Sequence, residues 1–137
     1  MSQDKIEAEK IAKSWLDEII STVSNKNLDA HLNLISKKVN LTGIPGYDSI
    51  GYEGWSNQCQ HEFENNIIKK ISYSGFILRA NTTTHIMFKT FETVEANDGT
   101  INAQGIEVTI EKESDGHWRV VHERVLPDDE SLHDGLQ

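Results

Sequence analysis

The sequence has little of what would tie a chain to a membrane or to a disulfide framework. Its single cysteine, Cys59, cannot form an internal disulfide. No stretch approaches the roughly 20 apolar residues of a membrane-spanning helix. The polar start, MSQDKIEAEK, lacks the basic group and apolar run of a secretory signal. We therefore expect a cytoplasmic protein that does not contact membranes.

Basic residues are also scarce, with 13 Lys and Arg against 22 Asp and Glu, a net charge of -9. Because nucleic-acid affinity depends mainly on Lys and Arg contacts to phosphates, this balance disfavours a nucleic-acid partner. The sequence also lacks a glycine-rich phosphate loop, a G-x-S-x-G nucleophile motif and a cysteine pair for zinc. We expect neither a cofactor nor a metal.

The length of 137 residues is typical of one domain. No internal repeat or low-complexity linker divides it. We assign residues 1–127 to this domain and expect residues 128–137, which carry part of the acidic excess, to be a loose tail.

Helical periodicity occupies the first half of the chain. From Asp4 to about Val23, apolar residues recur three or four positions apart, which predicts one long amphipathic helix. A shorter helix follows, with Asn27 as its N-cap. Trp55, Cys59 and Phe63 repeat at intervals of four and predict a third helix over residues 55–64.

Alternating patterns typical of β-strands dominate the second half. The hairpin signals NDG and SDG separate long strands that should pair antiparallel, and Gly105 suggests a bulge or bend. The predicted strands cover residues 39–42, 67–78, 82–95, 100–113 and 117–126. Helices on one face of one strongly bent, mainly antiparallel sheet give an α+β fold, and a curved sheet closed by helices leaves a conical cavity.

This order of elements, together with the ending DGHWRVVHERVLP, resembles the nuclear transport factor 2-like superfamily, in particular its SnoaL-like and ketosteroid-isomerase-like branch. The resemblance covers residues 5–127. It implies a conical α+β barrel, a homodimer formed across the outer sheet face, and a pocket inside the cone. Members use that pocket for isomerisation, dehydration, epoxide hydrolysis, polyketide cyclisation or binding alone. The final strand also resembles the association domain of calmodulin-dependent kinases.

The resemblance allows one activity to be rejected. Isomerase-type members place a carboxylate base at the end of the first strand, where this chain has Thr42 and Gly43. Their phenol donor falls near Ile19. Because a threonine hydroxyl cannot accept a proton near neutral pH, ketosteroid-isomerase chemistry is not expected.

The candidate functional pair is His122 and Arg124. Strand alternation places both on one face with Trp118 and Val120, and the resemblance implies that this face looks into the cone. His122 could then exchange a proton, and Arg124 could hold a carboxylate or carbonyl. The alternative is a structural histidine bound to a backbone carbonyl and an arginine paired with a neighbouring glutamate.

Further candidates surround the expected cone. Asp48, in the glycine-rich segment over the cone mouth, is the best substitute for the lost base, although loop carboxylates are ordinarily solvated. The predicted ligand contacts besides Arg124 are Tyr47, Trp55, His85 and Gln104. Trp55 could equally be a core residue, and alternation leaves the inward face of the strand around His85 undecided.

We therefore expect a small-molecule-binding protein, a homodimer whose cone holds an organic ligand with an anionic or carbonyl group near Arg124. One alternative is a cofactor-free lyase, isomerase or hydrolase that uses His122 as its base. The other is a protein assembly module without small-molecule chemistry, because this architecture hosts unrelated functions.

Overall fold

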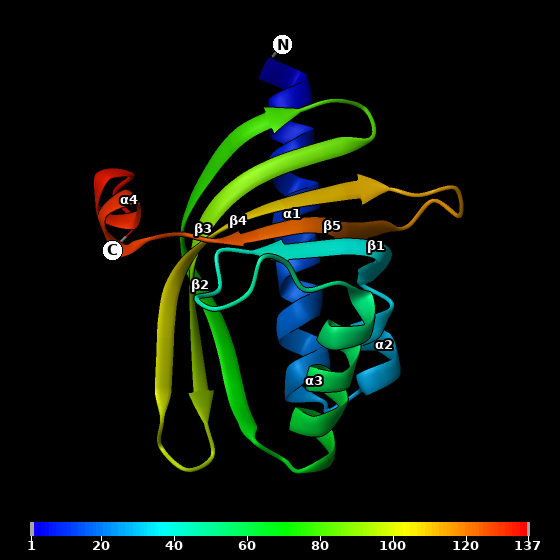
Figure 1. Ribbon diagram of the computed structural model, residues 1–137. Helices are drawn as coiled ribbons and strands as arrows, with labels where there is room; N and C mark the ends of the chain where they lie inside the picture. The colour runs from blue at the N-terminus through cyan, green and yellow to red at the C-terminus, as the bar shows by residue number, and fades with distance from the viewer. Residues whose placement is uncertain (1, 137) are drawn as a thin grey trace.

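The computed structural model describes residues 2–136 and has four helices and five strands among them (Figure 1). The elements are α1 (Ser2–Ser24), α2 (Leu28–Leu32), β1 (Ile35–Thr42), α3 (Tyr52–Glu64), β2 (Ile68–Asn81), β3 (His85–Ala96), β4 (Ile101–Lys112), β5 (Trp118–Val125) and α4 (Asp128–His133). None of these helices is long and apolar enough to cross a membrane.

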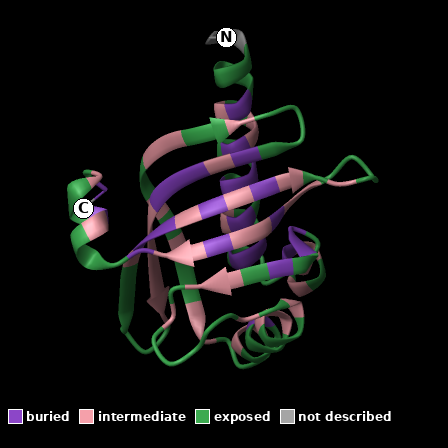
Figure 2. Ribbon diagram, turned by 45° about the horizontal axis from the view of Figure 1, so that its top comes forward, coloured by how far each residue is buried: buried purple, intermediate pink, exposed green. Residues whose placement is uncertain are grey.

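The predicted apolar stripe of α1 is confirmed. Ala8, Ala12, Trp15, Ile19 and Val23 are all buried, at positions three or four apart along the helix. They pack against the central strands, so that buried residues run along α1 and across the facing sheet (Figure 2). The α2 cap is also confirmed, because the Asn27 side chain accepts a hydrogen bond from Ala30 N at 3.2 Å.

The sheet has the strand order β1-β5-β4-β3-β2, in which β1 runs parallel to β5 and the other pairs are antiparallel. The prediction of an α+β fold is therefore confirmed. The sheet curves around α1 but stays open, because β1 and β2 are its two edges (Figure 1). The term barrel is wrong for this chain, whereas the description of a cone walled by helices and a bent sheet holds.

Of the bulge or bend expected at Gly105, the bulge is absent from the ladder with β3, because β4 pairs with β3 without interruption and Gly105 lies opposite Phe91. Irregular pairing occurs in β2 instead, where Gly75 has φ +66° and the register shifts between Ser74 and Ile77. Gly105 has a packing role. A Cβ there would lie 2.6 Å from Ser131 Oγ, so only glycine permits this approach of α4.

A bulge that the sequence pattern did not indicate lies in β5. Val120 pairs with Ile110 and His122 pairs with the adjacent Thr109, so Val121 is an extra residue. The bulge reverses the alternation after Val120. Val120 and Glu123 are consequently the buried residues of β5.

Residues 128–136 differ from the expected loose tail. They form α4 and a following turn, which pack on the outer face of the sheet. Ser131 is fully buried beside Gly105, and Leu136 is buried beside Gly75. Composition alone suggested a solvated tail, but two glycines in β2 and β4 leave room for it against the sheet.

Candidate functional site

The interior of the cone contains a cavity of about 230 Å³ between the helices and the concave face of the sheet. Its walls are mainly apolar and aromatic, and they come from α1, α2, α3 and four strands. The aromatic wall consists of Trp15, Trp55, Phe63 and Tyr73. We call this space the cone cavity.

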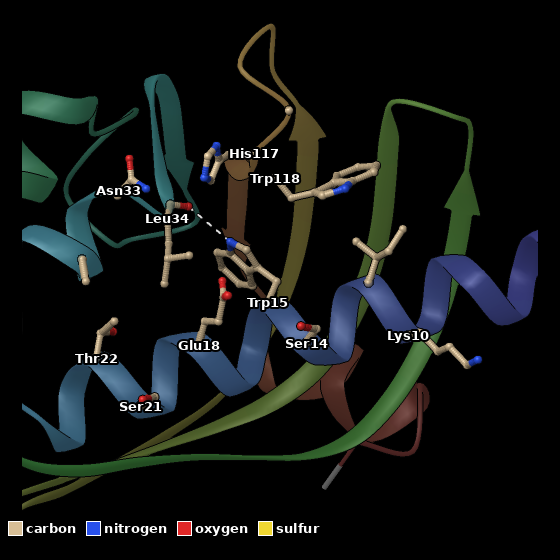
Figure 3. Close-up of a pocket in the computed structure, with 13 residues that line it drawn as sticks. Lys10, Ser14, Trp15, Glu18, Ser21, Thr22, Asn33, Leu34, His117 and Trp118 are labelled. Carbon is tan, nitrogen blue, oxygen red and sulfur yellow. Dashed lines mark hydrogen bonds between the residues drawn. The ribbon is translucent and has the colours of Figure 1, made fainter.

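A second hollow, of about 600 Å³, is a surface groove between α1, the end of α2 and the turn that joins β4 to β5 (Figure 3). Trp15 lies between the two hollows and lines both, while its indole Nε1 donates to the Leu34 carbonyl at 3.2 Å. The charged residues of the groove, Lys10, Glu18 and His117, are exposed. Buried ionisable groups occur in the cone cavity instead, which makes it the better candidate site.

Tyr73 and Glu92 form a hydrogen-bonded pair on two neighbouring strands. The Tyr73 hydroxyl of β2 donates to Glu92 Oε2 of β3 at 3.1 Å, directly across the ladder. Burial raises the pKa of Glu92, and the hydrogen bonds from Tyr73 and Gln104 lower it in part. Burial and then the neighbouring carboxyls raise the pKa of Tyr73 well above its usual range. Tyr73 is therefore a donor throughout the ordinary pH range.

Glu123 of β5 completes this polar set. Glu123 is only 9% exposed, and it lines the cone cavity. Within residues 2–136, this carboxyl has no hydrogen bond or ion pair, and its neighbours act on it through charge alone. Burial raises the pKa of Glu123 well above the usual value, and the carboxyl of Glu92 raises it further. An ionised Glu92 therefore makes the ionisation of Glu123 less favourable.

His31 of α2 adds a neutral acceptor to the wall. The Thr22 hydroxyl donates to Ile19 O at 3.0 Å, and Thr22 Oγ1 lies 2.9 Å from His31 Nδ1. Because the one hydroxyl proton is used, Nδ1 must carry the proton of the second bond, which leaves Nε2 as an acceptor. Burial lowers the pKa of His31 to about 4, so the ring is uncharged at neutral pH.

Cys59 lies in the same wall, on α3. Burial, followed by the charge of Glu62, raises the pKa of its thiol to about 12. A thiol with so high a pKa is a poor nucleophile, and the buried Cys59 is a core residue.

The charge of the cone cavity is one-sided. Glu62, Glu92 and Glu123 line it, whereas no lysine or arginine of the described chain does. Lys26 lies near the mouth beside Glu62, where its ammonium binds the side chain of Asn66. No group of three or more His, Cys, Asp or Glu residues in this part of the chain is arranged to hold a metal ion.

The structure places the predicted pair, His122 and Arg124, on the outer face of the sheet. His122 Nε2 lies 3.3 Å from Thr42 Oγ1 of β1. Arg124 forms ion pairs with Glu107 at 3.3 Å and Glu130 at 2.7 Å. The expectation that both look into the cone is therefore wrong. The reason is the extra residue Val121, which turns Glu123 inward in their place.

His85 is also outside the cone. It begins β3 at the rim of the sheet, where Nε2 contacts Glu111 Oε1 at 3.1 Å and the side chain is 50% exposed. His85 does not line the cone cavity, so the structure does not place it at the predicted ligand contact. Ile86 and Phe88, its alternate neighbours, face the core.

The other predicted residues divide into two groups. Tyr47 and Asp48 lie in the exposed loop after β1, and neither lines the cone cavity. Trp55 forms part of the cavity wall, and its side chain hydrogen-bonds Cys59. Gln104 pairs with Glu92 across the ladder and hydrogen-bonds its carboxyl.

Sequence reasoning missed Glu92, Glu123, Tyr73 and His31. Glu92 had a signal, because it shares the alternating face of Ile86 and Phe88 along β3. Glu123 had none, because nothing in WRVVHERVL marks Val121 as the extra residue.

No protein-family model matches the chain, and no curated protein matches it in sequence. Solved structures, in contrast, match it over most of its length. A candidate scytalone dehydratase from Novosphingobium aromaticivorans has a TM-score of 0.72 at 9% identity, covering 91% of this chain and 87% of that chain. A nuclear transport factor 2-like protein from Cytophaga hutchinsonii has a TM-score of 0.70 at 12% identity, covering 85% and 95%.

A protein of unknown function with a cystatin-like fold, from Nostoc punctiforme, has a TM-score of 0.64 at 11% identity and covers 85% of this chain and 88% of that chain. At such low identities, these similarities establish the fold alone.

Proposed function

We propose that this chain, which has a nuclear transport factor 2-like fold, binds a small organic molecule in the cone cavity. The observation that carries the proposal is a hollow of about 230 Å³ with aromatic walls and a few convergent polar groups, which is the composition of ligand sites. The volume is below the roughly 300 Å³ at which drug-sized pockets begin, so the ligand has about one ring.

The experiment fills the cavity and leaves the opposite face alone. Val94 of β3 lines the cone cavity, and its neighbour Thr93 belongs to the outer face. We expect a library of one-ring fragments to yield compounds that raise the melting temperature of the wild type. Val94→Trp should abolish these shifts, and Thr93→Trp should preserve them.

Two results would contradict the proposal. One is a library that yields no compound shifting the wild type. The other is a set of hits that shift the Val94→Trp and Thr93→Trp variants equally, which would place binding elsewhere on the surface.

Acid–base catalysis is a second candidate function, supported by two acids in the cavity wall, Glu92 and Glu123, whose pKa values burial raises. A buried carboxyl with a raised pKa can both donate and accept a proton near neutral pH. In this version Glu123 takes the role that the sequence suggested for His122. Exchange of the α-protons of small ketones in D₂O, followed by NMR, should then be catalysed by the wild type and abolished by Glu123→Gln. Equal exchange by both proteins would exclude Glu123 as the base.

The homodimer remains a proposal, as does membership of the SnoaL-like branch. The outer sheet face that the resemblance assigns to dimer contact is covered in part by α4. A dimer across this face would have to include α4 in its interface. Sedimentation equilibrium of the full chain would test this, and a single species of 15.5 kDa would exclude the dimer.

A further inference from the structure

The cone cavity contains acid groups for which its described wall supplies no lysine or arginine. Glu123 is 9% exposed and without a hydrogen-bond or ion-pair partner within residues 2–136. Among the described residues, the partners of the Glu92 carboxyl are the Tyr73 hydroxyl and the Gln104 amide, both of them neutral. A buried carboxyl without a compensating charge is a destabilising feature, and it suggests that the charge is supplied by a bound molecule.

The rest of the wall suits a positive charge as well. Trp15, Trp55, Phe63 and Tyr73 present aromatic rings to the same cavity. The faces of such rings attract cations, and aromatic cages with nearby carboxylates are a common way to bind ammonium groups. The net charge of -9 would also draw cations toward the molecule.

We propose that the cone cavity binds a small cationic amine, whose ammonium group pairs with Glu123 and whose hydrocarbon part lies against the aromatic wall. This inference rests on the proposed binding function and specifies its ligand class. It differs from the expectation drawn from sequence, an anionic or carbonyl ligand held by Arg124, because Arg124 lies outside the cone and the cavity wall is acidic.

Binding of an ammonium ion should change the protonation of the cavity. Burial raises the pKa of both Glu92 and Glu123, and a bound cation would favour the ionised carboxylates and so displace protons into the buffer. The other titratable groups that face this pair are Tyr73 on β2, His31 on α2, and Cys59 and Glu62 on α3. The α1 residues that line the cavity have no titratable side chain; they are Trp15, Ile19 and Val23.

The test compares three probes of matched shape that differ in charge: cyclohexylamine, cyclohexanol and cyclohexanecarboxylate. Titration calorimetry with the full chain at pH 7 should give an affinity for the amine at least tenfold above that for the alcohol, and no binding of the carboxylate. Amine binding should release a proton, seen as a difference in heat between phosphate and Tris buffers.

Two variants then locate the interaction. Glu123→Gln should lower amine affinity at least tenfold, leave alcohol affinity unchanged and abolish proton release. Glu107→Gln is the matched control, the same substitution on the outer face, and should bind the amine as the wild type does. Glu92→Gln provides a second test, with a smaller loss of amine affinity expected.

The outcomes separate the two proposals. Equal binding of amine and alcohol, or tighter binding of the carboxylate, would overturn the amine proposal and leave the binding function standing. Amine binding that Glu123→Gln does not weaken would also overturn it. If fragments bind the cavity but no amine does, only the ligand class is wrong; if no fragment binds, the binding function itself fails.

Discussion

The charged residues on the two faces of the sheet are in opposite environments. On the outer face, Lys89 of β3 contacts Glu130 at 3.1 Å and Asp134 at 2.7 Å, and Arg124 of β5 binds Glu107 and Glu130. On the inner face, the same two strands present Glu92 and Glu123, and no lysine or arginine in the described part of the chain lines the cavity.

This difference separates charges that stabilise the fold from charges that the fold tolerates. The ion pairs of the outer face, which we call the outer cluster, join Lys89 and Arg124 to Glu107, Glu130 and Asp134. In this cluster the chain supplies both signs of charge, and the pairs hold α4 against the sheet. The inner pair is buried and repulsive, which lowers stability unless a ligand compensates it. Charged groups that persist without a structural benefit are candidates for function.

Breaking the outer cluster should have the largest effect on stability. Lys89→Met removes a cation that is 7% exposed and leaves Glu130 and Asp134 facing each other. We expect a loss of about 2 kcal/mol in the free energy of unfolding, less than the 3–5 kcal/mol of a fully buried pair because Glu130 is partly exposed. Urea denaturation at pH 7 measures it. Lys38→Met, which removes an exposed ion pair to Glu111, is the control and should cost much less than Lys89→Met. Equal losses would show that the outer cluster is no stronger than an ordinary surface pair.

Glu123→Gln should have the opposite sign. The folded pKa of Glu123 is raised, so its contribution to stability is complete below the unfolded pKa of about 4.3 and is lost as the pH rises. Glutamine cannot titrate, and the variant should be more stable than the wild type by about 1 kcal/mol at pH 8. This advantage should shrink toward pH 4 in urea denaturation. A difference that is independent of pH would mean that Glu123 titrates as an exposed carboxyl does.

The variant Glu130→Gln tests how the stabilisation by the outer cluster depends on pH. Arg124 first, and then Lys89, lower the pKa of Glu130 to about 2. The stabilisation is therefore present above the unfolded pKa of about 4.3 and is lost as the pH falls toward 2. We expect the variant to lose about 1 kcal/mol at pH 7, since the pair is partly solvated, and to match the wild type near pH 2. Thermal unfolding at several pH values measures this. Asp48→Asn, in the exposed loop, should stay within about 0.5 kcal/mol of the wild type throughout.

Local patterns were sufficient to predict the layers of this fold. The spacing of Ala8, Ala12 and Trp15 indicated the buried face of α1, and NDG and SDG indicated the hairpins. These features depend on residues close together in the chain, which is why they can be read without the structure.

The site could not be predicted in the same way, because it depends on which way each strand faces. The extra residue Val121 turns Glu123 inward and His122 outward, the reverse of what simple alternation predicts. Such a bulge is determined by how β5 pairs with β1 and β4. The position of α4 depends likewise on Gly75 and Gly105, which are far from it in sequence.

The last comparison of the two faces uses the alkylation rate of the Cys59 thiol. This rate reports how far the thiol is buried, and measuring it does not require a change in the stability of the native protein. Burial raises the pKa of this thiol to about 12, so at pH 8 little thiolate is present. We expect iodoacetamide to alkylate native Cys59 at least about 100-fold more slowly than the urea-unfolded chain. A Thr93→Cys, Cys59→Ser variant moves the thiol to the outer face and should react much faster than native Cys59. Equal rates would mean that solvent reaches the cone cavity freely, and burial could then no longer account for the raised pKa of Glu123.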